Sequence, residues 1–113
     1  MTASADRYVS TRGYAADENF ADALLRGIAP DGGLYMPAAW ATMPADITQK
    51  GRTYADIGRD VLNPYIGSAL PAGAVERALK RLVEGFDHPL VTPLVELEAG
   101  LFVLELFRGP TAA

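Results

Sequence analysis

The chain has 113 residues, a net charge of −4 and no cysteine, and half of its residues are hydrophobic. A chain of this length buries roughly 65% of the surface that its unfolded form exposes, which is enough for one domain. With this negative charge, nothing in the composition suggests a basic surface that follows nucleic-acid phosphates. Without cysteine there are no disulfides or thiolate metal sites, and the single histidine, His88, cannot make a typical zinc site.

The N-terminus lacks the pattern of a secretion signal, because residues 1–6 are small and polar with no basic-then-apolar order. No apolar run approaches the roughly 20 residues that a membrane-spanning helix needs. We therefore expect a cytoplasmic protein with neither a nucleic-acid nor a membrane partner.

The first elements along the chain are a short strand and a helix. Residues 8–9 form an extended pair, followed by a polar turn. Asn19 fits a helix N-cap, and Asp22, three residues later, completes the capping-box pattern. Apolar residues then recur at helical spacing as far as Ile28 and predict one buried face.

A tight turn is predicted at Asp31-Gly32-Gly33, because two adjacent glycines permit positive φ. We expect both glycines to adopt it and the turn to fix a strand over 34–36 against the preceding helix. Backbone N–H groups in such a turn can also face an anion, but composition alone favours a plain tight turn.

Two further helices are predicted between residues 53 and 86, after an irregular stretch. Thr53 fits a second N-cap, with Asp56 in the capping-box position. Pro64 is expected to bend or end this helix. Pro71 is expected to open the third helix, whose apolar residues give the clearest helical period in the chain.

The C-terminal part predicts two strands, over 94–97 and 101–107, joined by a short turn. The second strand has six apolar residues in seven, Glu105 being the exception, and such strands are normally covered on both faces. Three helices with one apolar face each cannot cover it fully, so we expect an exposed apolar patch there. The predicted fold is α+β, with about three helices and a small sheet, in one domain over residues 1–113.

Few residues have the pattern of a catalytic site. Glu96 and Glu98 alternate with apolar residues, as on the solvent face of a strand. Glu105 fits either a site residue or a structural carboxylate with a partner, and His88 fits a loop histidine that makes one backbone hydrogen bond. The polar loop over 108–111 follows the last strand, and loops in this position often carry sites in α/β proteins.

Six short motifs, spread over nearly the whole chain, are specific enough to compare with known families. They are YVSTRG at 8–13, FADALLRG at 20–27, DGGLYMP at 31–37, DHP at 87–89, VTPL at 91–94 and LELFRGPT at 104–111. In this order and at these spacings they resemble the N-terminal region of threonine synthase.

The resemblance implies part of an enzyme that converts O-phospho-L-homoserine and water to L-threonine and phosphate, a carbon–oxygen lyase of threonine biosynthesis. Its cofactor is pyridoxal phosphate (PLP), which a lysine holds and which acts as an electron sink. The family motif continues from Gly-Pro-Thr through one variable residue to Ala-Phe-Lys-Asp. The cofactor lysine would therefore lie beyond Ala113, in a catalytic domain of the same polypeptide into which residues 101–113 lead.

The resemblance also makes Arg108, Gly109, Pro110 and Thr111 candidates for an active-site loop. It implies no catalytic residue and no metal ligand within the chain. Arg108 occupies the position where the family usually has histidine. A guanidinium stays charged near pH 7, whereas an imidazole can be neutral, so this departure could alter proton handling near the cofactor.

Taken alone, the chain is expected to hold no cofactor and to be inactive. Lys50 falls in a predicted loop and Lys80 on the outer face of the third helix, where an activated, desolvated amine is not expected. Two alternatives stay open at this point. One is a stand-alone binding module that reuses this domain, and the other is part of a related PLP-dependent phospholyase that eliminates phosphate without making threonine.

Overall fold

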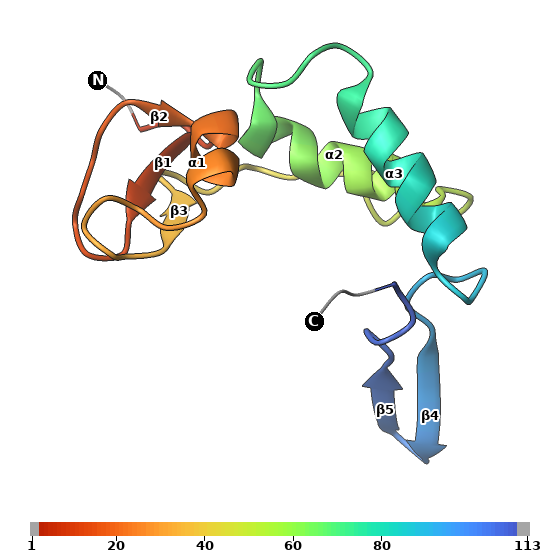
Figure 1. Ribbon diagram of the computed structural model, residues 1–113. Helices are drawn as coiled ribbons and strands as arrows, with labels where there is room; N and C mark the ends of the chain where they lie inside the picture. The colour runs from red at the N-terminus through yellow and green to blue at the C-terminus, as the bar shows by residue number, and fades with distance from the viewer. Residues whose placement is uncertain (1–2, 111–113) are drawn as a thin grey trace.

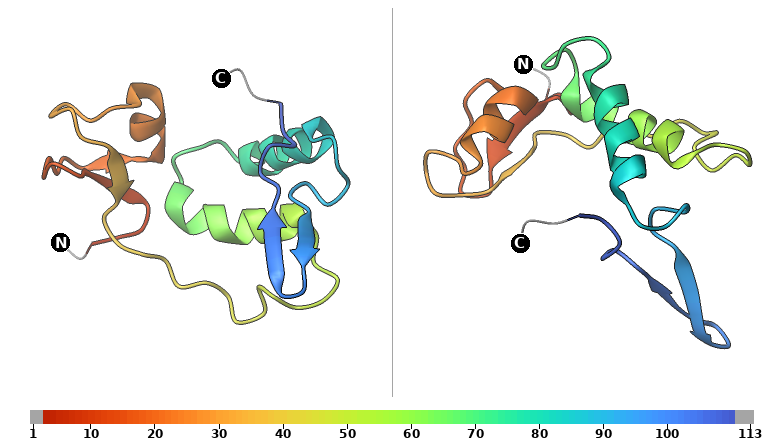
Figure 2. Two further views of the ribbon diagram at one scale, coloured as in Figure 1. Left: turned by 90° about the horizontal axis from the view of Figure 1, so that it is seen from below. Right: turned by 45° about the vertical axis from the view of Figure 1, so that its right-hand side comes forward.

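The computed structural model describes residues 3–110, which form three successive parts (Figure 1). A small antiparallel sheet with one helix comes first, a pair of helices follows, and a two-stranded hairpin comes last. The radius of gyration is 16.6 Å, against about 13 Å for a compact chain of this length. The excess arises because the hairpin projects away from the other two parts (Figure 2). The predicted α+β class with three helices is confirmed, although the strands form two sheets.

The N-terminal sheet has the strand order β2-β1-β3, with all pairs antiparallel. Its central strand β1 covers Arg7–Ser10, β2 covers Glu18–Asn19 and β3 covers Tyr35–Pro37. The strand predicted over residues 8–9 is therefore confirmed, with one more residue at each end. Tyr8 of the central strand is buried in this part of the chain.

Helix α1 covers Phe20–Arg26 and begins with the predicted capping box. The Asn19 side chain accepts the Asp22 N–H, and the Asp22 carboxylate accepts the Asn19 N–H, both at 3.0 Å. The Phe20 ring packs on the Tyr8 ring, with the ring centroids 6.2 Å apart. The helix thereby closes one side of the sheet.

The turn before β3 differs from the prediction in two respects. Gly32 has a φ of +79°, but Gly33 does not have positive φ. Gly33 is needed for space instead, because a Cβ there would overlap the hydroxyl oxygen of Ser10. The strand after the turn also pairs with β1, in the register Val9 with Met36, rather than being fixed against α1.

Helix α2 covers Tyr54–Ile66 and begins with the predicted Thr53 capping box. Pro64 was expected to bend or end this helix, and it does not end the helix at once, because two further residues are helical. A proline in a last turn removes only one helical hydrogen bond. The N–H of Gly67 closes that turn by donating to the Asn63 carbonyl at 2.9 Å.

Helix α3 covers Ala74–Gly85 and lies beside α2. The prediction that Pro71 opens this helix is wrong. The helix begins after Gly73, which takes the left-handed φ of +78°. The two helices approach closely because α2 carries a glycine at the crossing. An added Cβ on Gly58 would lie 2.8 Å from the buried Leu79 side chain.

The C-terminal hairpin pairs β4, Leu94–Glu98, with β5, Leu101–Leu104. Strand β5 ends three residues earlier than predicted. The N–H of Glu105 still donates to the carbonyl of Pro93 at 3.0 Å. Proline has no N–H to return, so the ladder stops at that point.

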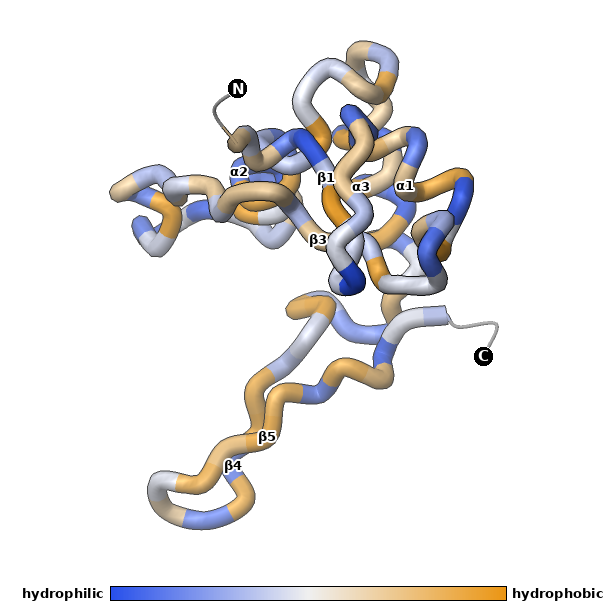
Figure 3. The backbone as a smooth tube through the Cα atoms, turned by 90° about the vertical axis from the view of Figure 1, so that its left-hand side faces the viewer, coloured by the Kyte–Doolittle hydropathy of each residue, from blue (hydrophilic) through white to orange (hydrophobic). Residues whose placement is uncertain are grey.

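The hairpin is apolar along most of its length (Figure 3). Every residue of its two strands is exposed. The apolar side chains that follow it, Leu106 and Phe107, are 69% and 72% exposed. The predicted exposed patch is therefore confirmed. The buried hydrophobic residues lie elsewhere in the described chain: Tyr8, Ala23, Ala29, Ile66, Leu79 and Val91. Over residues 3–110, none of the helices has the length and hydropathy of a membrane span.

Candidate functional site

The loop after β5 is the segment that the sequence singles out as a candidate active-site loop. The structure places Arg108, Gly109 and Pro110 against the C-terminal end of α3, whereas Thr111 lies outside the described residues. The N–H of Asp87 donates to the carbonyl of Arg108 at 3.1 Å. This bond joins two segments that are 21 residues apart in the chain.

Gly109 lies directly on the ring of Phe86. An added Cβ at this position would lie 2.5–2.9 Å from three ring carbons, closer than real Cβ contacts come. Pro110 in turn lies beside the last residue of α3, since an added Cβ on Gly85 would be 3.4 Å from its ring. The loop is therefore packed against the helix end.

Arg108 lies between two carboxylates. Its Nη2 and Nε both donate to Oε1 of Glu105, at 2.7 and 3.2 Å, and its Nη1 lies 3.6 Å from Oδ1 of Asp87. The hydrogen bonds to Glu105, together with the charges of Glu105 and Asp87, raise the pKa of the Arg108 guanidinium above its ordinary value. Its Cζ also lies 5.3 Å from the centroid of the Phe107 ring, within cation–π range.

This geometry bears on the two interpretations of Glu105. The side chain is 16% exposed and its Oε1 accepts two hydrogen bonds from Arg108, which favours a structural carboxylate with a partner. Glu96 and Glu98 are exposed, as predicted for the solvent face of a strand. His88 also behaves as predicted, because its Nδ1 accepts one backbone hydrogen bond, from the Leu90 N–H at 3.1 Å.

The loop between α3 and β4 contains a feature that sequence reasoning missed. Val91 has a φ of +63° and is 1% exposed. The Thr92 N–H donates to the Leu90 carbonyl at 2.7 Å, which closes a three-residue turn of the strained, positive-φ kind. A β-branched residue rarely adopts this conformation, so no local signal could have predicted it.

The hydrogen-bond donors around the turn over 31–33 bind a carboxylate of the turn itself, that of Asp31. The Asp31 carboxylate accepts the Ser10 hydroxyl at 2.6 Å and the N–H groups of Gly33 and Tyr14 at 3.0 Å. The Ser10 hydrogen bond, followed by these backbone donors, lowers the pKa of Asp31. The donors that could have faced a ligand are thus used within the turn, which favours the plain structural interpretation.

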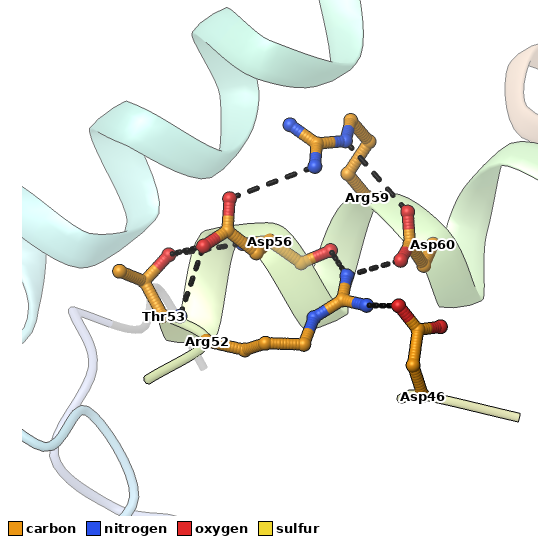
Figure 4. A network of polar contacts seen from close by, with 6 residues as sticks. All are labelled: Asp46, Arg52, Thr53, Asp56, Arg59 and Asp60. Carbon is orange, nitrogen blue, oxygen red and sulfur yellow. Dashed lines mark hydrogen bonds and ion pairs between the residues drawn. The ribbon is translucent and has the colours of Figure 1, made fainter. Parts of the chain in front are cut away.

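A network of arginines and aspartates at the start of α2 was also missed (Figure 4). Arg52 contacts the carboxylates of Asp46 and Asp60, and Arg59 contacts those of Asp56 and Asp60. The Asp60 hydrogen bond is the main cause that raises the pKa of Arg52. The network borders an open groove of about 670 Å³ between α2, α3 and the loop over 89–91. Its two arginines pair with three aspartates, and the contact between Arg52 and Asp46 ties the preceding loop to the helix.

Neither lysine has the surroundings of an activated amine. Lys50 is exposed, and the Lys80 side chain is 77% exposed with its Nζ 3.9 Å from Glu84. Within residues 3–110, the structure brings together no group of histidine and acidic side chains that could hold a metal ion.

Comparisons with known proteins show which family this chain is similar to. A family model described as "Threonine synthase N terminus" matches residues 7–84. The chain is 38% identical to threonine synthases of Schizosaccharomyces pombe and Pseudomonas aeruginosa over 94% and 95% of its length. It is also 38% identical to human threonine synthase-like 2 over 94% of its length.

A solved structure shows the same similarity in three dimensions. The crystal structure of PLP-bound threonine synthase from Brucella melitensis superposes with a TM-score of 0.81 and 44% identity, over 92% of this chain. The chain spans only 21–23% of the length of the relatives named here.

Proposed function

The chain belongs to the threonine synthase family through the family's N-terminal region, and from this premise we propose that it is the N-terminal domain of a threonine synthase. The complete enzyme would convert O-phospho-L-homoserine and water to L-threonine and phosphate in the cytoplasm, with neither nucleic acid nor membrane as partner. The observation that carries the proposal is the similarity to the PLP-bound Brucella enzyme over almost the whole chain.

The exposed hairpin supports a catalytic domain of the same polypeptide as the partner. Both strands expose apolar side chains, and the two residues after Glu105 add more. Large contiguous apolar patches on proteins are usually interaction sites. The relatives are four to five times longer than this chain, which leaves ample polypeptide to cover the patch. We propose that the catalytic domain packs on this hairpin and that residues 101–113 lead into it.

The residues described here do not by themselves fit PLP, because both lysines are exposed and neither has the surroundings of an activated amine. The cofactor lysine would lie beyond Ala113. When bound, the cofactor supplies an electron sink for charge at the amino-acid α-carbon. The contribution of this chain would be the candidate active-site loop over 108–111, whose described residues pack against the end of α3.

The test uses the product of the native gene, incubated with O-phospho-L-homoserine while phosphate and threonine are both quantified. The proposal predicts equal amounts of the two products. Phosphate without threonine would identify a phospholyase, and neither product would favour a stand-alone binding module. The 113-residue chain assayed in parallel should release no phosphate.

A further inference from the structure

Five residues join the segment after β5 to the end of α3, and we call this set the clasp: Phe86, Asp87, Glu105, Arg108 and Gly109. Three kinds of contact act together in it. Arg108 bridges the two carboxylates, the Asp87 N–H donates to the Arg108 carbonyl, and Gly109 lies on the Phe86 ring.

The two carboxylates of the clasp differ in exposure. Glu105 is 16% exposed and makes two hydrogen bonds, whereas Asp87 is 67% exposed and forms only a longer ion pair. Charge-assisted hydrogen bonds are stronger than neutral ones, and exposed ion pairs are weak. Glu105 lies three residues before Arg108, so this pair orders the segment after β5 itself, whereas Asp87 supplies a weaker side-chain link from Arg108 to the end of α3.

Within this chain, the hairpin does not fix the loop by packing against the other elements. Both faces of β4 and β5 are exposed, so neither strand is wedged between other elements. Gly109 restricts the path of the loop, because it lies against the Phe86 ring with no space for a side chain. The direction in which the chain leaves residue 110 is thus set at the clasp.

We propose that Arg108 is a positioning residue, which fixes through Glu105 and Asp87 the direction of the segment that leads to the cofactor lysine. This inference rests on the proposed function. A planar guanidinium can hold two carboxylates at once with a permanent charge, which a histidine cannot do. Because both carboxylates already compensate its charge, Arg108 is neither a free phosphate-binding cation nor a proton carrier.

The first readout needs no catalysis and uses the 113-residue chain. Arg108→Ala should speed amide hydrogen exchange of the Asp87 N–H about tenfold or more, since the carbonyl that accepts it is no longer held. Arg108→Lys should recover part of the protection. Asp87→Asn should have an effect of at most about fivefold, because the pair it breaks is exposed. Asp17→Asn is the matched control, since it breaks another exposed pair, with Arg7, and should change nothing at the clasp.

The second readout uses the full-length enzyme with PLP bound. Arg108→Ala should lower kcat roughly 10- to 100-fold, as small misplacements of reacting groups do, with little change in KM. The visible absorbance of the bound cofactor should also shift, and Arg108→Lys should restore part of both. The pH profile of kcat should keep its shape, because a guanidinium does not titrate near neutral pH.

Unchanged exchange and unchanged kcat in Arg108→Ala would overturn the proposal. So would a kcat loss accompanied by a shifted pH profile, which would make Arg108 part of proton transfer. If the wild-type enzyme makes no threonine, the proposed function fails and the catalytic role of the clasp fails with it. The exchange measurement on the chain separately decides whether the clasp itself exists.

Discussion

At the residue scale, the clearest electrostatic feature is the Asp31 carboxylate, whose pKa the Ser10 hydroxyl and two backbone N–H groups lower. A group with a lowered folded pKa contributes stability that is fully present above its unfolded pKa of about 3.9. That contribution is lost as pH falls through the folded value. We therefore predict that the free energy of unfolding decreases below about pH 4.

Asp31→Asn should destabilise the chain at pH 7 and should weaken this acid dependence, as measured by urea denaturation at several pH values. The pKa of Asp56 is lowered chiefly by the Thr53 backbone N–H, so Asp56 should still contribute to the acid dependence in this variant. An acid dependence in Asp31→Asn identical to that of the wild type would contradict the assignment.

Gly33 gives a prediction about space rather than backbone conformation. A Cβ there would overlap the Ser10 hydroxyl and lie 3.1 Å from Oδ1 of Asp31. Gly33→Ala should therefore destabilise the chain by about 1–3 kcal/mol, the usual cost of overpacking. Thermal unfolding measures this cost. An unfolding temperature equal to that of the wild type would show that the turn can relax around a methyl group.

At the element scale, the Thr53 capping box makes the start of α2 testable. Thr53→Ala removes the acceptor of the Asp56 N–H and should cost about 1 kcal/mol in unfolding free energy. Thr48→Ala is the matched control, because Thr48 is an exposed threonine in the preceding loop. Equal losses in the two variants would mean that the cap contributes nothing.

The elements also show which parts of the fold were predictable. Both capping boxes could be identified from sequence because their partners lie three residues apart, at Asn19 and Asp22 and at Thr53 and Asp56. The end of β5 could not, because it depends on Pro93, which directly precedes the partner strand. The candidate loop was located by motif resemblance.

The clasp that holds the loop escaped prediction for a related reason. Asp87 and Arg108 are far apart in the chain, and only the tertiary fold brings them together. The arginine network of α2 escaped prediction in the same way, because Arg52 contacts Asp46, which precedes it in the chain, and Asp60, which follows it.

At the scale of the whole molecule, the exposed hairpin should determine how the isolated chain behaves. We predict that the 113-residue chain binds a hydrophobic dye or self-associates, because its apolar strands face solvent. Phe102→Lys, at a 51% exposed position opposite Glu96, should reduce dye binding with little effect on unfolding. Leu25→Lys is a control on α1, where the leucine is 86% exposed but lies outside the hairpin. A dye-silent monomer would favour the stand-alone module.

The central claim is that this chain is one domain of a PLP enzyme whose cofactor lysine lies outside it. The most direct measurement is borohydride reduction of the native gene product, followed by proteolysis and mass spectrometry of the labelled peptide. The account predicts one PLP-bearing lysine on the C-terminal side of Ala113. A label on Lys50 or Lys80, or a native product that takes up no PLP, would contradict it.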